Sequence, residues 1–307
     1  MDKGSTWATA AGFGAILLWS ATVALSRSLS EQFGPLLTGA LVFTCSGLLT
    51  LAFTRLRAGS RTGSDTGTPF SYRYYLGCGG LFLIYTVSFY LAIGLARDRA
   101  QAVELALLNY LWPSLTILFS ALLLPVKASW VLLPGLCLAF GGIVVVMIPA
   151  QGAGWAFFLD HVAGNPAAYA SAFTAGVTWA VYSVLTRRWA PAGGGGAPYF
   201  MVLSGLALAG LAAAKGTDWG ALKLRNGIEP VFLILSTAVA YAFWDIAMRR
   251  GKVTRVAAAS NFTPLFSTLV SCAYLGVTPA PRVWIGSLLI AAGSLVCWRS
   301  VRESSEQ

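Results

Sequence analysis

Long runs of hydrophobic residues, separated by short polar segments, cover almost the whole chain. A helix needs about 20 apolar residues to cross the hydrocarbon core of a membrane. Ten runs approach this length, at about residues 6–26, 35–54, 74–96, 101–124, 130–149, 167–187, 197–214, 230–249, 255–276 and 283–299. The longest polar gap, residues 55–73, is rich in Gly, Ser and Thr and is typical of a flexible connector. The pattern predicts an all-α polytopic membrane protein with ten transmembrane helices.

The second half of the chain repeats the first at a nearly fixed offset of 151 to 160 positions. The copies are residues 1–150 and 151–307, with five predicted spans each. Because five is odd, the second copy enters the membrane from the opposite side. Such an inverted repeat around a central cavity is typical of secondary transporters. The matched pairs include Pro113 with Pro264, Gly135 with Gly286, Gly142 with Gly293, Trp19 with Trp179, and Arg27 with Arg187.

Composition and charge support membrane insertion. Hydrophobic residues make up 57% of the chain and charged residues 10%, whereas soluble proteins contain about 25% charged residues. The net charge of +10 does not indicate nucleic-acid binding, because the Lys and Arg residues lie in loops between spans. With the N-terminus in the cytoplasm, 14 of the 21 fall on the cytoplasmic side and 7 on the other. We expect both termini in the cytoplasm and no nucleic-acid partner; the oligomeric state stays open, although a monomer suffices.

The first run also has weak features of a cleaved signal peptide, since Lys3 precedes it and small residues follow it near Ser26. However, Trp19 and Arg27 have counterparts in the second copy, and removal of this run would leave nine spans. We expect it to be a transmembrane helix.

The chain offers little chemistry for catalysis, a cofactor or a metal. Its five Cys residues lie inside predicted spans without a CxxC pair, and its one histidine, His161, lies in the loop between the copies. No nucleotide-binding or protease motif occurs. A membrane-embedded lipid-modifying enzyme would need clustered His, Asp or Glu residues; it is the alternative from a different class, together with a scaffold subunit. We expect no cofactor and no enzymatic activity.

Several of these features occur together in one group of proteins. Two sets of five spans, short loops, Pro-bearing fourth and ninth spans and Gly-rich fifth and tenth spans resemble the drug/metabolite transporter superfamily, nearest its EamA-type branch. The sequence NYLWPS at residues 109–114 is similar to a segment of the YddG-type exporters of aromatic amino acids. The resemblance covers essentially the whole chain. It implies export of small metabolites across the bacterial inner membrane, linked to a proton or another gradient.

Pro113 and Pro264 fall near the middle of the fourth and ninth predicted spans. A proline inside a helix frees a backbone carbonyl and kinks the helix, which a membrane tolerates where other groups satisfy the backbone. An ordinary packing kink is the simpler interpretation. Because the two prolines occupy matching positions, we expect a pair of bent helices that line the cavity and act as hinges.

Polar residues within the spans need partners or a wet cavity. Asn109 and Asn261 lie just before the two prolines and are either substrate contacts or interhelical hydrogen-bonding residues. Glu104 and Asp245 are candidate proton-coupling residues. The simpler interpretations are an interfacial position for Glu104 and an ion pair of Asp245 with Arg249, four residues later on a helix.

Aromatic residues are numerous at mid-span depth. A cavity walled by rings, with a few hydroxyl groups, suits an apolar or aromatic molecule, and a ring face can also hold an amine. For any single residue, packing against lipid or neighbouring helices is the simpler interpretation, whereas the set as a whole favours a hydrophobic substrate. The expected substrate-binding residues, on the first, third, fourth, sixth, eighth and ninth spans, are Trp19, Tyr85, Asn109, Trp112, Trp179, Tyr182, Tyr241 and Asn261.

The middle third of every predicted span lacks Lys and Arg. A carrier of nucleotide sugars or sugar phosphates would need such residues to neutralise phosphate. The sequence therefore predicts a secondary transporter that exports aromatic or hydrophobic amino acids by alternating access. The alternative within transport is a carrier of another metabolite class, such as drugs or nucleotide sugars.

Overall fold

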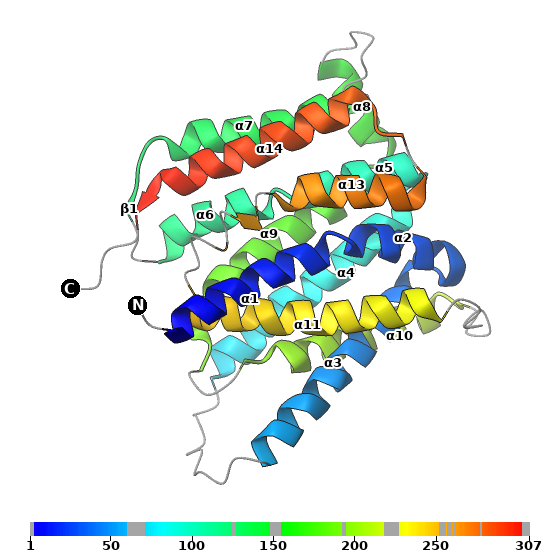
Figure 1. Ribbon diagram of the computed structural model, residues 1–307. Coiled ribbons are helices and arrows are strands. Elements are labelled where there is room, and N and C mark those ends of the chain that lie inside the picture. Colours follow the sequence, from blue (N-terminus) through cyan, green and yellow to red (C-terminus); the bar gives the residue numbers. More distant parts are fainter. Residues whose placement is uncertain are drawn as a thin grey trace.

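The computed structural model of the chain describes residues 3–59, 71–124, 127–147, 155–191, 195–217, 227–251, 256, 259–260, 262–276 and 278–302. Helices make up nearly all of this part (Figure 1). In the first half they are α1 (Lys3–Trp19), α2 (Thr22–Phe33), α3 (Pro35–Gly59), the π-helical turn η1 (Arg73–Cys78), α4 (Gly79–Leu95), α5 (Arg99–Asn109), α6 (Trp112–Leu123) and α7 (Leu132–Met147). The second half contains α8 (Trp155–Gly164), α9 (Pro166–Trp189), α10 (Ala197–Ala214), α11 (Ile228–Arg250), α13 (Thr263–Leu275) and α14 (Pro281–Arg299).

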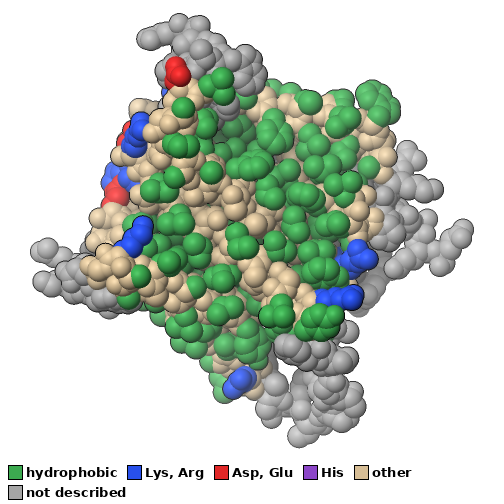
Figure 2. All heavy atoms as spheres, turned by 180° about the vertical axis from the view of Figure 1, so that it is seen from behind, with side chains coloured by type: hydrophobic (Ala, Val, Ile, Leu, Met, Phe, Trp, Pro, Cys, Tyr) green, Lys and Arg blue, Asp and Glu red, His purple; other side chains and the backbone are tan. Residues whose placement is uncertain are grey.

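Seven helical segments of the described chain are long and apolar enough to cross a membrane. They are Thr6–Phe33, Pro35–Leu56, Arg73–Leu95, Gln101–Leu123, Ala197–Ala214, Ile228–Arg250 and Pro281–Arg299. Two shorter helices, Leu132–Val145 and Thr263–Leu275, are also apolar. Figure 2 shows a broad surface of hydrophobic side chains with charged side chains mostly at its margins. The chain is therefore a helical, polytopic membrane protein.

The helices form layers that pair the two halves of the chain. At one edge α7 lies along α14, and at the opposite edge α3 lies along α10 (Figure 1). Between these edges α4 packs against α9, and α1 packs against α11. The start of α1 and the end of α14 lie at the same end of the bundle. Each of the most extensive contacts therefore joins one helix of the first half to one of the second.

Two predicted spans are interrupted where the sequence suggested continuous helices. The first span is divided into α1 and α2 at Ser20–Ala21, and it continues to Phe33 rather than ending near residue 26. The fourth is divided into α5 and α6 at Tyr110–Leu111. Both breaks lie inside the bundle, so they place helix ends at membrane depth.

The structure places the two prolines at helix starts rather than at the mid-helix positions that we expected. Pro113 lies in the first turn of α6, and Pro264 lies in the first turn of α13. The backbone N–H groups of the first helical turn have no acceptor within the helix, so a proline, which lacks an N–H, is tolerated there. Each proline thus begins a half-helix.

Two small elements lie outside the predicted pattern. Residue 161, expected in a loop, falls within the short helix α8. The strand β1 (Lys127–Ala128) pairs antiparallel with β2 (Val301–Arg302). This pairing ties the segment before α7 to the segment after α14, at one end of the helix pair.

Glycines allow α7 and α14 to approach closely, as their abundance in these spans suggested. A Cβ atom at Gly142 would lie 2.6 Å from the carbonyl oxygen of Gly286, and one at Gly135 would lie 2.9 Å from that of Gly293. In the sequence repeat Gly135 matches Gly286, and Gly142 matches Gly293. The two contacts are therefore reciprocal, as a twofold relation between the helices requires.

We expect Gly142→Ala to destabilise the protein by about 1–3 kcal/mol, the usual cost of overpacking, because the added methyl group meets backbone atoms of α14. Gly141→Ala is the matched control, since no atom lies within 4 Å of a Cβ at Gly141 and alanine favours a helix over glycine by about 1 kcal/mol. The melting temperature in detergent should fall for the first variant and not for the second. Equal behaviour of the two variants would contradict the packing described here.

Candidate functional site

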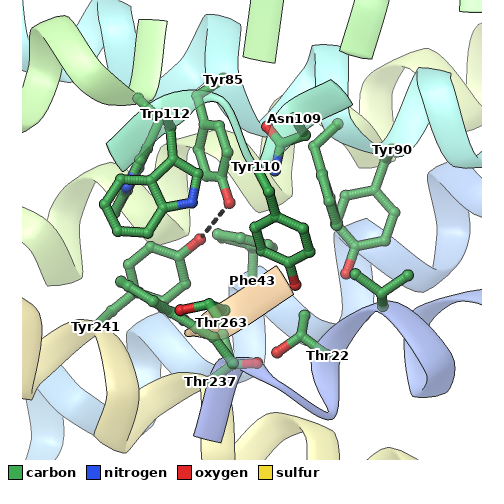
Figure 3. Close-up of a pocket in the computed structure, with 14 residues that line it drawn as sticks. Thr22, Phe43, Tyr85, Tyr90, Asn109, Tyr110, Trp112, Thr237, Tyr241 and Thr263 are labelled. Carbon is green, nitrogen blue, oxygen red and sulfur yellow. Dashed lines mark hydrogen bonds between the residues drawn. The ribbon is translucent and has the colours of Figure 1, made fainter. Parts of the chain in front are cut away.

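A pocket lies where the interrupted helices meet at the centre of the bundle (Figure 3). The volume of the pocket that is accessible to water is about 40 Å³, whereas a single water molecule needs about 10–15 Å³ by the same measure. It is therefore narrow in this conformation. Its lining comes from both halves of the chain and consists of Trp19, Thr22, Val23, Phe43, Tyr85, Phe89, Tyr90, Asn109, Tyr110, Trp112, Trp179, Thr237, Tyr241 and Thr263.

The structure brings together six of the eight residues that the sequence suggested for substrate binding: Trp19, Tyr85, Asn109, Trp112, Trp179 and Tyr241. Tyr182 lies next to the pocket, with its ring centroid 5.2 Å from that of Trp179, but does not line it. Asn261 lies outside the described residues.

Sequence reasoning missed the threonine hydroxyl groups of the pocket and the contribution of the second span. Thr22, Thr237 and Thr263 line the pocket, and Phe43 reaches it from α3. For Thr263 a signal was present, because it directly precedes Pro264. Nothing in the sequence marked Thr22, because the helix break beside it was not predicted. Phe43 is one of many phenylalanines in apolar spans, and nothing in the sequence distinguishes it.

The rings of the pocket wall contact each other mostly edge to face. The ring centroids of Trp19 and Trp179 are 5.3 Å apart, and that of Trp19 is 5.3 Å from Tyr241. Trp112 contacts Trp244, just beyond the lining, at 5.2 Å. Edge-to-face pairs contribute about 0.5–1.5 kcal/mol each beyond the burial of their area. These contacts hold the rings as one wall around the pocket.

Polar groups of the pocket are neutral, and several have no partner. The hydroxyl groups of Tyr241 and Tyr85 form a hydrogen bond of 3.3 Å, the dashed line in Figure 3. By contrast, Trp19 Nε1, Asn109 Oδ1 and Thr263 Oγ1 are buried without a hydrogen-bond partner in the described part of the chain. Buried polar groups usually are hydrogen-bonded, so each such group requires an explanation.

The two buried carboxylates lie away from the pocket lining, and each has a partner. Tyr169 on α9 donates a hydrogen bond of 3.1 Å to Glu104, so Glu104 is buried between α5 and α9. Asp245 forms the expected ion pair, with its Oδ2 2.6 Å from the guanidinium of Arg249.

Two arginines that match in the sequence repeat make equivalent contacts. Arg27 donates a hydrogen bond of 3.1 Å to the carbonyl of Ile93, near the end of α4. Arg187 donates one of 2.9 Å to the carbonyl of Arg249, at the end of α11. Each arginine thus binds the carboxyl end of a helix from its own half, as a positive group does at a helix C-terminus.

A model of the EamA-like transporter family matches residues 6–148 and again residues 163–299. The chain belongs to this family. The transporter is also similar to the aromatic amino acid exporter YddG of Salmonella typhimurium and that of Escherichia coli K12. Each is 33% identical to it over 96% of this chain and 98% of the relative. The exporter YddG of Ancylobacter novellus is 32% identical over 94% and 96%.

The fold of the transporter also matches a solved structure. A crystal structure with 29% sequence identity superposes with a TM-score of 0.68 and covers 95% of this chain and 96% of its own.

We expect Asp245→Ala to lower the stability of the transporter by about 3–5 kcal/mol, because it leaves the guanidinium of Arg249 largely buried without its partner. Removal of both charges in Asp245→Leu with Arg249→Met should recover most of this loss. The melting temperature in detergent measures both variants. A double variant no more stable than the single one would contradict this explanation.

Proposed function

We propose that the transporter exports aromatic amino acids across a bacterial inner membrane by alternating access. The observation that carries this proposal is the central pocket, which is walled by aromatic rings and has no charged side chain among its described lining residues. Such a wall fits a flat apolar side chain. Three relatives that match nearly the full chain are named as aromatic amino acid exporters.

The chemistry of the pocket also favours an amino acid over phosphorylated cargo. A phosphate group needs Arg or Lys to pair with it, and the described lining has neither. A zwitterionic amino acid carries no net charge and needs hydrogen-bonding groups, which Asn109 and the threonines supply. Trp19, Tyr85, Trp112, Trp179 and Tyr241 surround the side chain. Tyr182 supports Trp179 from behind.

For the architecture we propose ten spans in two inverted five-helix repeats, residues 1–150 and 151–307, with both termini in the cytoplasm. The double match of the family model supports the repeat. So do the reciprocal glycine contacts of α7 with α14 and the equivalent contacts of Arg27 and Arg187. The even number of spans agrees with the position of α1 and α14 ends on one side of the bundle (Figure 1).

Two further roles follow from this architecture. Pro113 and Pro264 keep the half-helices separate, so that α6 and α13 tilt against the rest of the bundle during the conformational change. Glu104 and Asp245 are the candidates for proton coupling, because they are buried carboxylates of the described spans. Asn261, beside the start of α13, is a further candidate contact.

The substrate is tested by counterflow into vesicles that contain the purified protein. Labelled Phe, Trp and Tyr should accumulate when the vesicles hold the unlabelled amino acid, and a sugar phosphate should not. Cells that overproduce the protein should tolerate toxic aromatic analogues better than control cells. Failure of all three amino acids to accumulate, with no gain in tolerance, would reject this substrate class.

Replacement of either Pro113 or Pro264 by alanine should slow the conformational step. Alanine at position 113 restores the N–H that can donate to the carbonyl of residue 109, so that α5 and α6 can join into one stiffer helix. We expect turnover to fall about tenfold, equivalent to about 1.4 kcal/mol in the barrier, with a smaller change in substrate affinity. Pro281→Ala is the matched control, because Pro281 also begins a helix but lies in α14, away from the pocket. Wild-type turnover in both pocket variants would show that the prolines are structural.

A further inference from the structure

We infer that the pocket binds its amino acid in one orientation, with the carboxylate at Thr263 and the ammonium group at Asn109. This assignment rests on the proposed function and makes these two residues specificity-determining for the polar end of the substrate. Thr263 is not among the residues that the sequence suggested for substrate binding. Figure 3 shows both residues among the side chains that line the pocket.

The first observation is that both side chains are buried and incompletely bonded. Thr263 is 0% exposed and Asn109 is 7% exposed. The hydroxyl oxygen of Thr263 and the amide oxygen of Asn109 have no partner in the described part of the chain. A buried polar group without a partner costs about 1–3 kcal/mol. A ligand that supplies the missing partner recovers this cost when it binds.

The second observation is the position of each residue at a helix end. Thr263 is the first residue of α13, and the preceding residue, Phe262, provides no side-chain cap for the N–H groups of the first turn. A helix N-terminus carries a partial positive charge and binds carboxylates. Asn109 is the last residue of α5. The carboxyl end of a helix carries a partial negative charge and favours a cation.

The donor and acceptor chemistry agrees with these helix ends. A threonine hydroxyl donates a hydrogen bond to a carboxylate, whereas an amide oxygen accepts one from an ammonium group. The amide of Asn109 can rotate to present its oxygen. In addition, Pro113 has no N–H to donate to the backbone carbonyl of Asn109, four residues earlier. That carbonyl lies against Gly176 of α9, where an added Cβ would be 2.9 Å from it, so the amide oxygen is the acceptor of Asn109 proposed for the ammonium group.

The repeat also shows why one orientation is favoured. At the offset of 151 positions, Thr263 matches Trp112, and Asn109 matches Ser260. Both Trp112 and Thr263 begin a half-helix at the pocket. The start of α6 therefore presents a ring, and the equivalent start of α13 presents a hydroxyl group. The site is asymmetric although its helices are related by the repeat, so the side chain of the substrate lies on the Trp112 side.

The test compares three ligands that share a phenyl ring: phenylalanine, phenethylamine, which lacks the carboxylate, and 3-phenylpropionate, which lacks the ammonium group. Affinity for the purified protein is measured from the ligand-dependent rise in melting temperature, which needs no transport. The wild type should bind phenylalanine more tightly than either analogue. Loss of a hydrogen bond to a charged group should change affinity about tenfold or more.

Thr263→Val should lower the preference for phenylalanine over phenethylamine about tenfold and leave the preference over 3-phenylpropionate unchanged. Asn109→Leu should have the opposite effect. Thr263→Ser, which keeps the hydroxyl group, should behave as the wild type. Thr178→Val is the matched control, because the hydroxyl of Thr178 bonds the carbonyl of Thr174 in its own helix and lies outside the pocket lining.

The possible outcomes distinguish the proposed orientation from the reverse orientation, from a structural role of the two residues and from a failure of the proposed function. Variants that lower the affinity for all three ligands equally would overturn the assignment and give both residues a structural role. If Thr263→Val lowered the preference over 3-phenylpropionate and Asn109→Leu lowered the preference over phenethylamine, the substrate would bind in the reverse orientation, and the assignment would be overturned. Wild-type protein that is stabilised by none of Phe, Tyr and Trp would reject the proposed function itself, and the assignment with it. If the wild type binds these amino acids but the variants keep its selectivity, the assignment is rejected and the proposed function stands.

Discussion

In the hydrocarbon core of a membrane every backbone N–H and C=O group must find a partner inside the protein, and the structure depends on where this constraint is relaxed. Most of the chain satisfies it with continuous helices. At the centre of the bundle the chain stops at Trp19 and Asn109 and begins again at Thr22, Trp112 and Thr263. Helix ends at this depth are tolerated where they line a cavity, and the pocket lies there.

The edges of the bundle supply the rigidity that the centre lacks. Along α7 and α14, glycine contacts bring the backbones close enough that a methyl group would not fit. Along α3 and α10, Gly47 approaches the backbone of Val202 in the same way. Close packing of this kind relies on many small contacts and tolerates little displacement. In the proposed transport cycle, the broken helices move between these two closely packed edges.

The composition of the pocket matches the requirements of a carrier. Aromatic contacts of about 0.5–1.5 kcal/mol each give a binding energy that grows with the ring of the ligand but stays moderate. The hydrogen-bonding groups left unpaired in the narrow pocket raise the energy of the empty state. In the proposed cycle, a substrate pairs with these groups when it binds and is released on the opposite side. Strong ion pairs within the pocket would hinder that release, and the described lining has none.

The amino-acid sequence by itself determined the membrane character, the repeat and the residues that lie deep in the spans. The length of each apolar run and the offset of the repeat can be read from the order of the residues, so Trp19, Asn109 and Trp179 could be selected without a structure. The sequence also suggested the Asp245–Arg249 ion pair, because four residues on a helix separate the two groups by one turn.

Only the tertiary structure decided which of these residues share a pocket and where the helices break. Phe43 and Thr237 reach the pocket because α3 and α11 pack against the broken helices. Tyr182 packs against Trp179 and does not line the pocket. The sequence favoured kinks at Pro113 and Pro264 because a proline alone excludes one hydrogen bond. Whether the chain bends or begins a new helix depends on whether neighbouring helices leave room for unpaired backbone, and that is a property of the packed bundle.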